Sequence, residues 1–98
     1  MDKVEFPMVD VPRLRPMEGH RIWLRFSNGR EGVYDLSGCV MSGGPMVAPL
    51  KDPVFFARVF IESGAPSWPN GFDLDPIKIY MDLRDAKLLT KPDADAAE

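Results

Sequence analysis

The sequence has little of what metal sites and nucleophilic active sites are built from. It contains one cysteine, Cys39, and one histidine, His20. A structural zinc site needs four such ligands, and a single cysteine excludes a disulfide within the chain. We therefore predict no metal site and no cofactor, and the lone cysteine favours a reducing compartment.

Long apolar runs and an excess of positive charge are also missing. No stretch approaches the roughly 20 apolar residues that cross a bilayer as a helix, and residues 1–5 lack the apolar run of a signal peptide. We expect a cytoplasmic protein with no membrane segment. Twelve Lys and Arg against 15 Asp and Glu give a net charge of −3, which makes non-specific nucleic-acid binding an unfavoured function.

Glycine-rich phosphate loops are absent too, because Gly43-Gly44 lacks the lysine and the spacing of a P-loop. The chain has instead ten prolines and eight glycines, which imply many turns and short elements. Its 98 residues suffice for one domain with a modest core. We predict a small α+β domain over residues 1–83, followed by a partly disordered tail over residues 84–98.

A β-hairpin is the clearest local pattern. Apolar and polar residues alternate over residues 20–26, the period of a half-buried strand. Asn28-Gly29 then favours a two-residue type I′ turn, with a return strand over residues 31–36. This turn would place Trp23 opposite Tyr34, on one face of the sheet.

The other elements are expected to be short, giving about four strands and two helices. We predict an edge strand near residues 8–14, a loop over 37–49, a helix over 53–57, a core strand over 58–62 and a helix over 77–83. Each helix begins at an Asp-Pro pair, where the aspartate caps and the proline takes the first helical position. Residues 77–83 also alternate like a strand, but the cap at Asp75 and the Leu74–Ile79 staple spacing favour a helix.

The stretch from Ser67 to Pro76 is the densest in residues with special backbone demands. One interpretation is a rigid turn that closes the core, with Trp68 buried and its indole N–H bonded to a carbonyl. The other is an exposed rim of Trp68, Asn70 and Asp73 that anchors a partner.

The sequence contains three further groups of candidate functional residues. Cys39 and His20 would form a dyad if they met, although a lone cysteine is more often a small buried residue. Asp73 and Asp75 would suit a hard cation, unless they serve their own loop and helix. An arginine-rich first third would offer single-stranded nucleic acid or an acidic partner a basic, aromatic face, made of Arg13, Arg15, Arg21, Arg25 and Arg30 with Trp23 and Tyr34.

Four segments together resemble a bacterial family of unknown function, the domain family numbered 2442. They are Leu24-Arg25-Phe26-Ser27-Asn28-Gly29, Val33-Tyr34-Asp35-Leu36-Ser37, Pro49-Leu50-Lys51-Asp52-Pro53 and Trp68-Pro69-Asn70-Gly71-Phe72-Asp73-Leu74-Asp75-Pro76. The family usually has Asp at the position of Asn28. The resemblance implies a curled, mostly antiparallel sheet with short helices and no established activity. It also implies that members are often encoded beside other small proteins, sometimes in pairs that look like toxin–antitoxin systems.

We therefore predict a non-enzymatic module that binds another small protein in a regulatory or antitoxin-like role. Its surface would be the face with Trp23, Arg25 and Tyr34, or the rim at Trp68, Asn70 and Asp73. A ligand-binding protein or enzyme with a site near residues 68–75 is the first alternative, and a nucleic-acid-binding regulator is the second. An edge strand protected only by Pro7 and Pro12 leaves a homodimer open.

Overall fold

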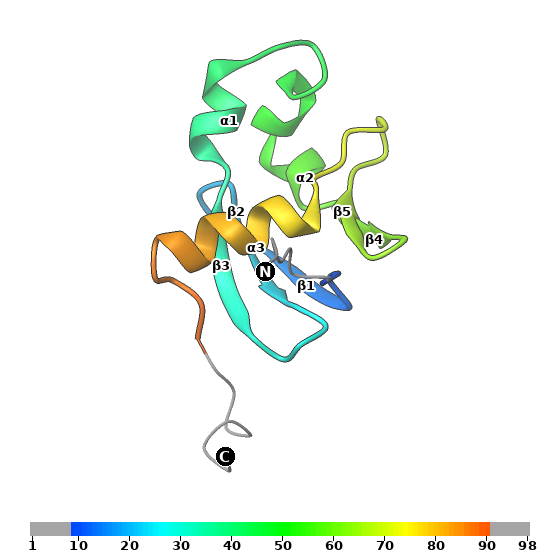
Figure 1. Ribbon diagram of the computed structural model, residues 1–98. Coiled ribbons are helices and arrows are strands. Elements are labelled where there is room, and N and C mark those ends of the chain that lie inside the picture. The colour runs from blue at the N-terminus through cyan, green and yellow to red at the C-terminus, as the bar shows by residue number, and fades with distance from the viewer. Residues whose placement is uncertain (1–8, 91–98) are drawn as a thin grey trace, which may run out of the picture.

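Two antiparallel sheets and three short α-helices make up the fold in the computed structural model, which describes residues 9–90 (Figure 1). The predicted α+β class with antiparallel strands is confirmed. The elements in chain order are β1 (Arg13–Met17), β2 (Arg21–Arg25), β3 (Glu31–Asp35), α1 (Ser37–Ser42), the 3-10 helix η1 (Ala48–Lys51), α2 (Pro53–Phe56), β4 (Phe60–Glu62), β5 (Ala65–Ser67) and α3 (Pro76–Asp85).

The β2–β3 hairpin is present, but its turn is one residue longer than predicted. The Phe26 N–H donates to the Arg30 carbonyl at 2.8 Å, which leaves residues 27–29 as a three-residue loop. Only Gly29 in this loop has a positive φ, at 91°, as in a type I turn followed by a left-handed residue. A type I′ turn would need Asn28 in that region too, and the Asn28 side chain instead accepts from the Arg30 N–H at 3.1 Å.

The longer turn changes which side chains share a face of the sheet. Trp23 lies opposite Val33, and Tyr34 lies opposite Ile22. Because a shift of one residue moves a whole strand's side chains to the other face, Tyr34 lies on the side of α3, away from Trp23. The prediction that Trp23 and Tyr34 pair on one face was therefore wrong.

The edge strand also starts later than predicted. β1 begins after Pro12 and pairs with β2, so that Arg15 lies opposite Trp23. Residue 8, where the strand was expected to begin, lies outside the described residues. Pro16 sits within β1, where an edge position tolerates the missing N–H. The chain before β1 is held by the Val11 N–H, which donates to the Gly64 carbonyl at 2.7 Å.

Residues 37–49 contain α1 and the start of η1 rather than only loop. Leu36 and Val40 lie one helical turn apart, and both are buried. The Val40 N–H donates to the Leu36 carbonyl at 2.9 Å. The prediction of a loop rested on local sequence, in which Gly38 has a low helix propensity. Burial of the Leu36 and Val40 side chains outweighs that propensity.

The predicted core strand over residues 58–62 was wrong in both length and burial. β4 has three residues, all exposed, and pairs with β5 in a separate two-stranded sheet. Ser63 and Gly64, with φ of 53° and 80°, turn the chain straight back. Val59, just before β4, is the residue that packs against the core.

Both predicted helix starts are confirmed. Asp52 and Asp75 each accept a hydrogen bond at 3.0 Å, from the N–H groups of Val54 and Ile77. The helix interpretation of residues 77–83 is therefore correct, and α3 continues to Asp85. Beyond it, the Thr90 N–H donates to the Glu31 carbonyl at 2.8 Å, beside β3.

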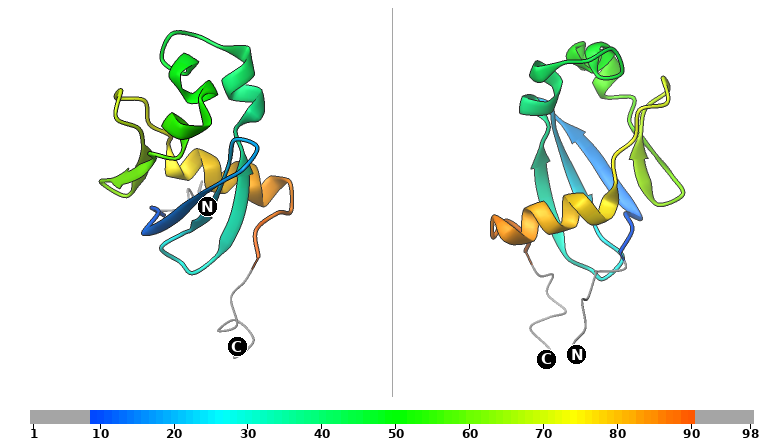
Figure 2. Two further views of the ribbon diagram at one scale, coloured as in Figure 1. Left: turned by 180° about the vertical axis from the view of Figure 1, so that it is seen from behind. Right: turned by 45° about the horizontal axis from the view of Figure 1, so that its top comes forward.

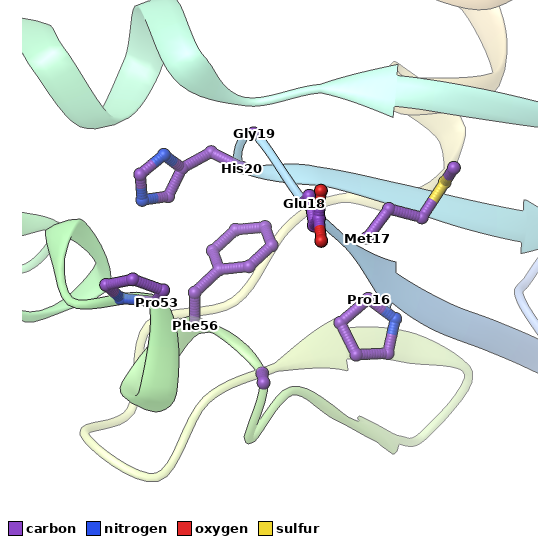
Figure 3. Close-up of a pocket in the computed structure, with 8 residues that line it drawn as sticks. Pro16, Met17, Glu18, Gly19, His20, Pro53 and Phe56 are labelled. Atoms are coloured by element: carbon purple, nitrogen blue, oxygen red, sulfur yellow. The ribbon is translucent and has the colours of Figure 1, made fainter.

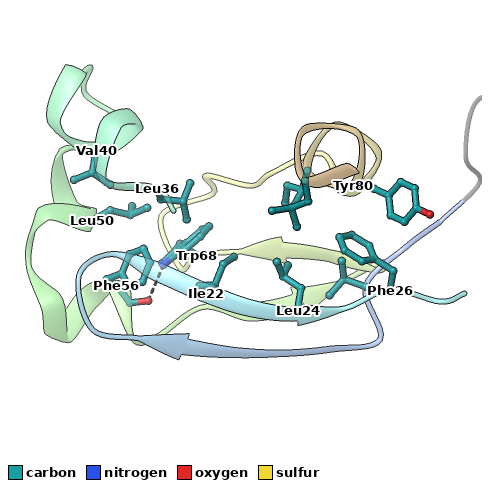
Figure 4. Packing of buried hydrophobic residues seen from close by; sticks show 12 residues of the cluster. Ile22, Leu24, Phe26, Leu36, Val40, Leu50, Phe56, Trp68 and Tyr80 are labelled. Atoms are coloured by element: carbon teal, nitrogen blue, oxygen red, sulfur yellow. Dashed lines mark hydrogen bonds between the residues drawn. The ribbon is translucent and has the colours of Figure 1, made fainter. Parts of the chain in front are cut away.

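The core lies between the three-stranded sheet, α3 and the helical segment around α2 (Figures 2 and 4). α3 crosses one face of the sheet, and the opposite face carries no helix in the described part of the chain (Figure 2). The twelve buried residues of the core cluster are Val11, Ile22, Leu24, Phe26, Leu36, Val40, Leu50, Phe56, Trp68, Ile79, Tyr80 and Leu83.

Candidate functional site

The sheet face that α3 leaves uncovered is the first candidate. Alternation along β2 places Ile22 and Leu24 in the core, so their neighbours point to the opposite side. Residues directly opposite across the strands share that side. We call this surface the open face, and its residues are Arg13, Arg15, Met17, Arg21, Trp23, Arg25, Glu31, Val33 and Asp35.

Trp23 lies at the centre of the open face, between two guanidinium groups. The Cζ atoms of Arg15 and Arg25 lie 5.5 and 6.0 Å from the ring centroid, within the range of a cation–π interaction. The Arg25 guanidinium also donates to the Glu31 carboxylate. The Trp23 ring therefore lies beside two guanidinium groups, and the ion pair with Glu31 fixes that of Arg25.

The open face is more positive than the chain as a whole. Its four arginines and two carboxylates leave two positive charges, whereas the whole chain carries −3. Hydrogen bonds from Ser37 lower the pKa of Asp35, so this carboxylate stays ionised at neutral pH. The open face is thus basic overall, and it carries the carboxylates of Glu31 and Asp35 along β3.

Tyr34 has a structural task on the other side of the sheet. Its hydroxyl donates to Asp82 Oδ2 at 2.7 Å, which joins β3 to α3. Burial, and then the Asp82 carboxylate, raise the pKa of Tyr34. The same hydrogen bond lowers the pKa of Asp82, whose carboxylate also lies 3.2 Å from Lys78 Nζ.

Trp68 is a core residue, with 1% of its surface exposed. Its Nε1–H donates to the Phe56 carbonyl at 2.9 Å (Figure 4). The ring centroids of Phe56 and Phe72 each lie 5.7 Å from that of Trp68. Trp68 therefore closes the core, and an exposed rim cannot be built on its ring.

The other two rim residues lie in the loop that Trp68 begins. Asn70 Nδ2 donates to the Met46 carbonyl at 2.9 Å, and its Oδ1 accepts from the Phe72 N–H at 3.3 Å. Asp73 is exposed and forms an isolated backbone bridge with Ser67. Asn70 thus ties two loops together, and Asp73 is the one rim residue that faces solvent.

His20 and Cys39 line different hollows, and the imidazole of His20 bonds the Lys51 carbonyl; no hydrogen bond of a dyad joins the two side chains among residues 9–90. His20 lines a cavity of about 330 Å³ between the β1–β2 turn and α2 (Figure 3). Cys39 lines a cleft of about 310 Å³, next to Leu74 and Asp75. Asp73 lines neither hollow.

The described residues also show no cluster of three or more His, Cys, Asp or Glu side chains placed to hold a metal ion. Asp75 of the considered cation pair is engaged as the cap of α3. No helix between residues 9 and 90 has the length and apolar character to cross a membrane.

Two features of these sites were not predicted from the sequence. The contact between Arg15 and Trp23 depends on where β1 starts, and Pro12 was the available signal for that start. The His20 cavity is lined by a turn and by a helix more than 30 residues further along the chain. No local sequence pattern predicts a contact over that separation.

Comparison with protein families matches residues 5–85 to a family described as "Protein of unknown function (DUF2442)". No curated protein and no solved structure matches the chain.

Proposed function

Since the chain belongs to the DUF2442 family, whose function is unknown, we propose a function from its own geometry. The protein is a non-catalytic interaction module, and its open face binds an acidic segment of another small protein. The observation that carries this proposal is the partly exposed Trp23 ring between the Arg15 and Arg25 guanidinium groups.

The chemistry of this surface suits an acidic polypeptide. Arginine and tryptophan are the side chains that most often dominate binding energy in protein interfaces. Carboxylates of a partner would accept hydrogen bonds from the guanidinium groups, while its aliphatic carbons pack on the Trp23 ring. Because Glu31 fixes Arg25 already, less side-chain entropy is lost on binding.

The acidic points on the face favour a protein over a nucleic acid. Glu31 and Asp35 lie directly opposite Arg25 and Arg21, and they would repel a continuous phosphate backbone. A polypeptide can place single carboxylates over Arg15 and Arg25 and leave Glu31 and Asp35 uncovered. A partner of this kind agrees with the paired small proteins that the family resemblance implies.

The test compares wild type with Trp23→Ala, using two fluorescent probes of equal length: an acidic Glu/Asp/Ser peptide and a single-stranded oligonucleotide. We expect the peptide to bind wild type at moderate salt and to lose about ten-fold or more in affinity with Trp23→Ala, as for a central aromatic anchor. Asp73→Ala, an exposed site away from the open face, serves as the matched control and should bind like wild type.

Two results would overturn the proposal. One is a peptide affinity that Trp23→Ala leaves unchanged. The other is tight, steeply salt-dependent binding of the oligonucleotide, with the peptide ignored, which would establish the nucleic-acid alternative.

A further inference from the structure

The cavity that His20 lines lies at one end of the open face and has not been given a role. It measures about 330 Å³ (Figure 3). The β1–β2 turn forms one wall, and α2 forms the other. The lining is mainly apolar, and its residues are Pro16, Met17, Glu18, Gly19, His20, Pro53, Phe56 and Ala57.

His20 lines this cavity from the turn between β1 and β2. Its φ is 58° and that of Gly19 is 77°, so two successive left-handed residues reverse the chain here. Two of its polar atoms have partners: Nε2 lies 3.2 Å from the Lys51 carbonyl, and the His20 carbonyl accepts from the Leu36 N–H.

At this wall His20 presents ring carbons toward Phe56 (Figure 3). The His20 and Phe56 rings lie edge to face, with centroids 5.1 Å apart, and both ring nitrogens of His20 point away from Phe56 (Figure 3). A surface of this kind fits an apolar group better than a polar one.

The cavity and the open face share Met17. Met17 lines the cavity and pairs with Arg21 across the strands of the open face. Arg21 Nε donates to the Glu18 carbonyl at 3.0 Å, which fixes the turn at the mouth. Arg21 and Trp23 are two residues apart on β2, which is about 7 Å along a strand.

We infer that the partner segment on the open face inserts one apolar side chain, such as Leu or Phe, into this cavity. This inference rests on the proposed function and specifies its partner. An apolar cavity of about 150 Å³ is enough for benzene, so the volume accepts any apolar side chain. An extended peptide advances about 3.3–3.6 Å per residue, so the apolar residue lies about two positions from a carboxylate over Arg15 and about four positions from one over Arg25.

The test uses two fluorescent acidic nonapeptides that differ at one position, Leu or Ala, with acidic residues about two and four positions from it. Fluorescence anisotropy should show the Leu peptide binding wild type about ten-fold tighter, the difference expected for burying a Leu side chain. Ala57→Leu fills the cavity from an exposed lining position and should abolish that difference. Val54→Leu, on the same helix but outside the cavity and 73% exposed, is the matched control and should preserve it.

Three results would overturn the inference, and they separate it from the proposed function. Equal binding of both peptides, lost together in Trp23→Ala, removes the apolar anchor and leaves the proposed function standing. If the Leu peptide still binds more tightly than the Ala peptide to the Ala57→Leu variant, the apolar side chain binds outside this cavity. Binding of both peptides that is indifferent to Trp23→Ala overturns both statements.

A second measurement needs no variant and so does not depend on whether Ala57→Leu folds. In wild type, NMR signals of the His20 and Phe56 rings should shift with the Leu peptide and stay unchanged with the Ala peptide. Unchanged ring signals with both peptides would contradict insertion.

Discussion

The indole N–H of Trp68 donates to the carbonyl oxygen of Phe56 at 2.9 Å inside the core. This bond joins the loop before α3 to the last residue of α2, twelve positions earlier in the chain. The same carbonyl also accepts from the Val59 N–H at 3.3 Å, so the indole supplies the shorter of its two hydrogen bonds.

Trp68→Phe should lower the free energy of unfolding by about 2 kcal/mol, through the lost indole hydrogen bond and the lost ring volume. Trp68→Ala should cost about 3–5 kcal/mol. Asp73→Ala, at an exposed position of the same loop, should stay within about 0.5 kcal/mol of wild type. Urea denaturation followed by circular dichroism measures all three, and a Trp68→Ala variant as stable as wild type would contradict the core assignment.

Tyr34→Phe should flatten the dependence of stability on pH at the acid side. The Tyr34 hydroxyl lowers the pKa of Asp82 in the folded state. That carboxylate therefore adds stability above its unfolded pKa of about 3.9, and the gain is lost as pH falls through the lower folded pKa.

The alkaline side offers a second check on the same variant. Tyr34 has a raised folded pKa, so its contribution is complete below about pH 10, the unfolded value, and is lost as pH rises further. Tyr34→Phe should lack this loss and should be about 1 kcal/mol less stable at pH 7. Urea midpoints over both pH ranges test this, and parallel curves for the two proteins would refute it.

Gly38→Ala and Gly64→Ala should change stability in opposite directions. A Cβ at Gly38, within α1, meets no atom within 4 Å, and Ala in a helix is favoured by about 1 kcal/mol. At Gly64 the φ is 80°, and a Cβ would come 2.6 Å from Asp10 Cβ. We expect Gly64→Ala to lower the melting temperature and Gly38→Ala to raise it slightly, so shifts of the same sign would contradict the backbone assignment.

Asn28→Asp should be almost neutral, whereas Asn28→Ala should cost about 1–2 kcal/mol. The Asn28 side chain accepts from the Arg30 N–H and donates from Nδ2 to the Tyr80 hydroxyl at 3.0 Å. An aspartate keeps the first bond and can accept from the Tyr80 O–H in place of the second. Thermal melting compares the variants, and equal losses for Asp and Ala would show that these bonds contribute nothing.

Local signals predicted the features that depend on a few neighbouring residues. Asp52-Pro53 and Asp75-Pro76 located both helix starts, because capping and the fixed φ of proline act within one turn. The alternation over residues 20–26 located β2, because the side chains of a strand alternate between neighbouring residues. It also placed Trp23 and Arg25 correctly on one face of the sheet.

Features set by distant contacts were out of reach. The hairpin register depends on a turn whose Asn28 is bonded to Tyr80, 52 residues later. β4 is exposed because it belongs to the separate two-stranded sheet, although its β-branched and aromatic residues are typical of a core strand. The Arg15–Trp23 contact likewise depends on the pairing of β1, which the sequence placed several residues too early.

The length of the β2–β3 loop decides the composition of two surfaces at once. With residues 27–29 in the loop, β3 directs Gly32 toward Leu83 of α3, where a Cβ would come 2.9 Å from Leu83 Cδ1, and directs Val33 to the open face. A single-residue deletion in the loop would exchange these directions along all of β3. We therefore expect a one-residue insertion or deletion at this turn to be tolerated only together with several substitutions along β3.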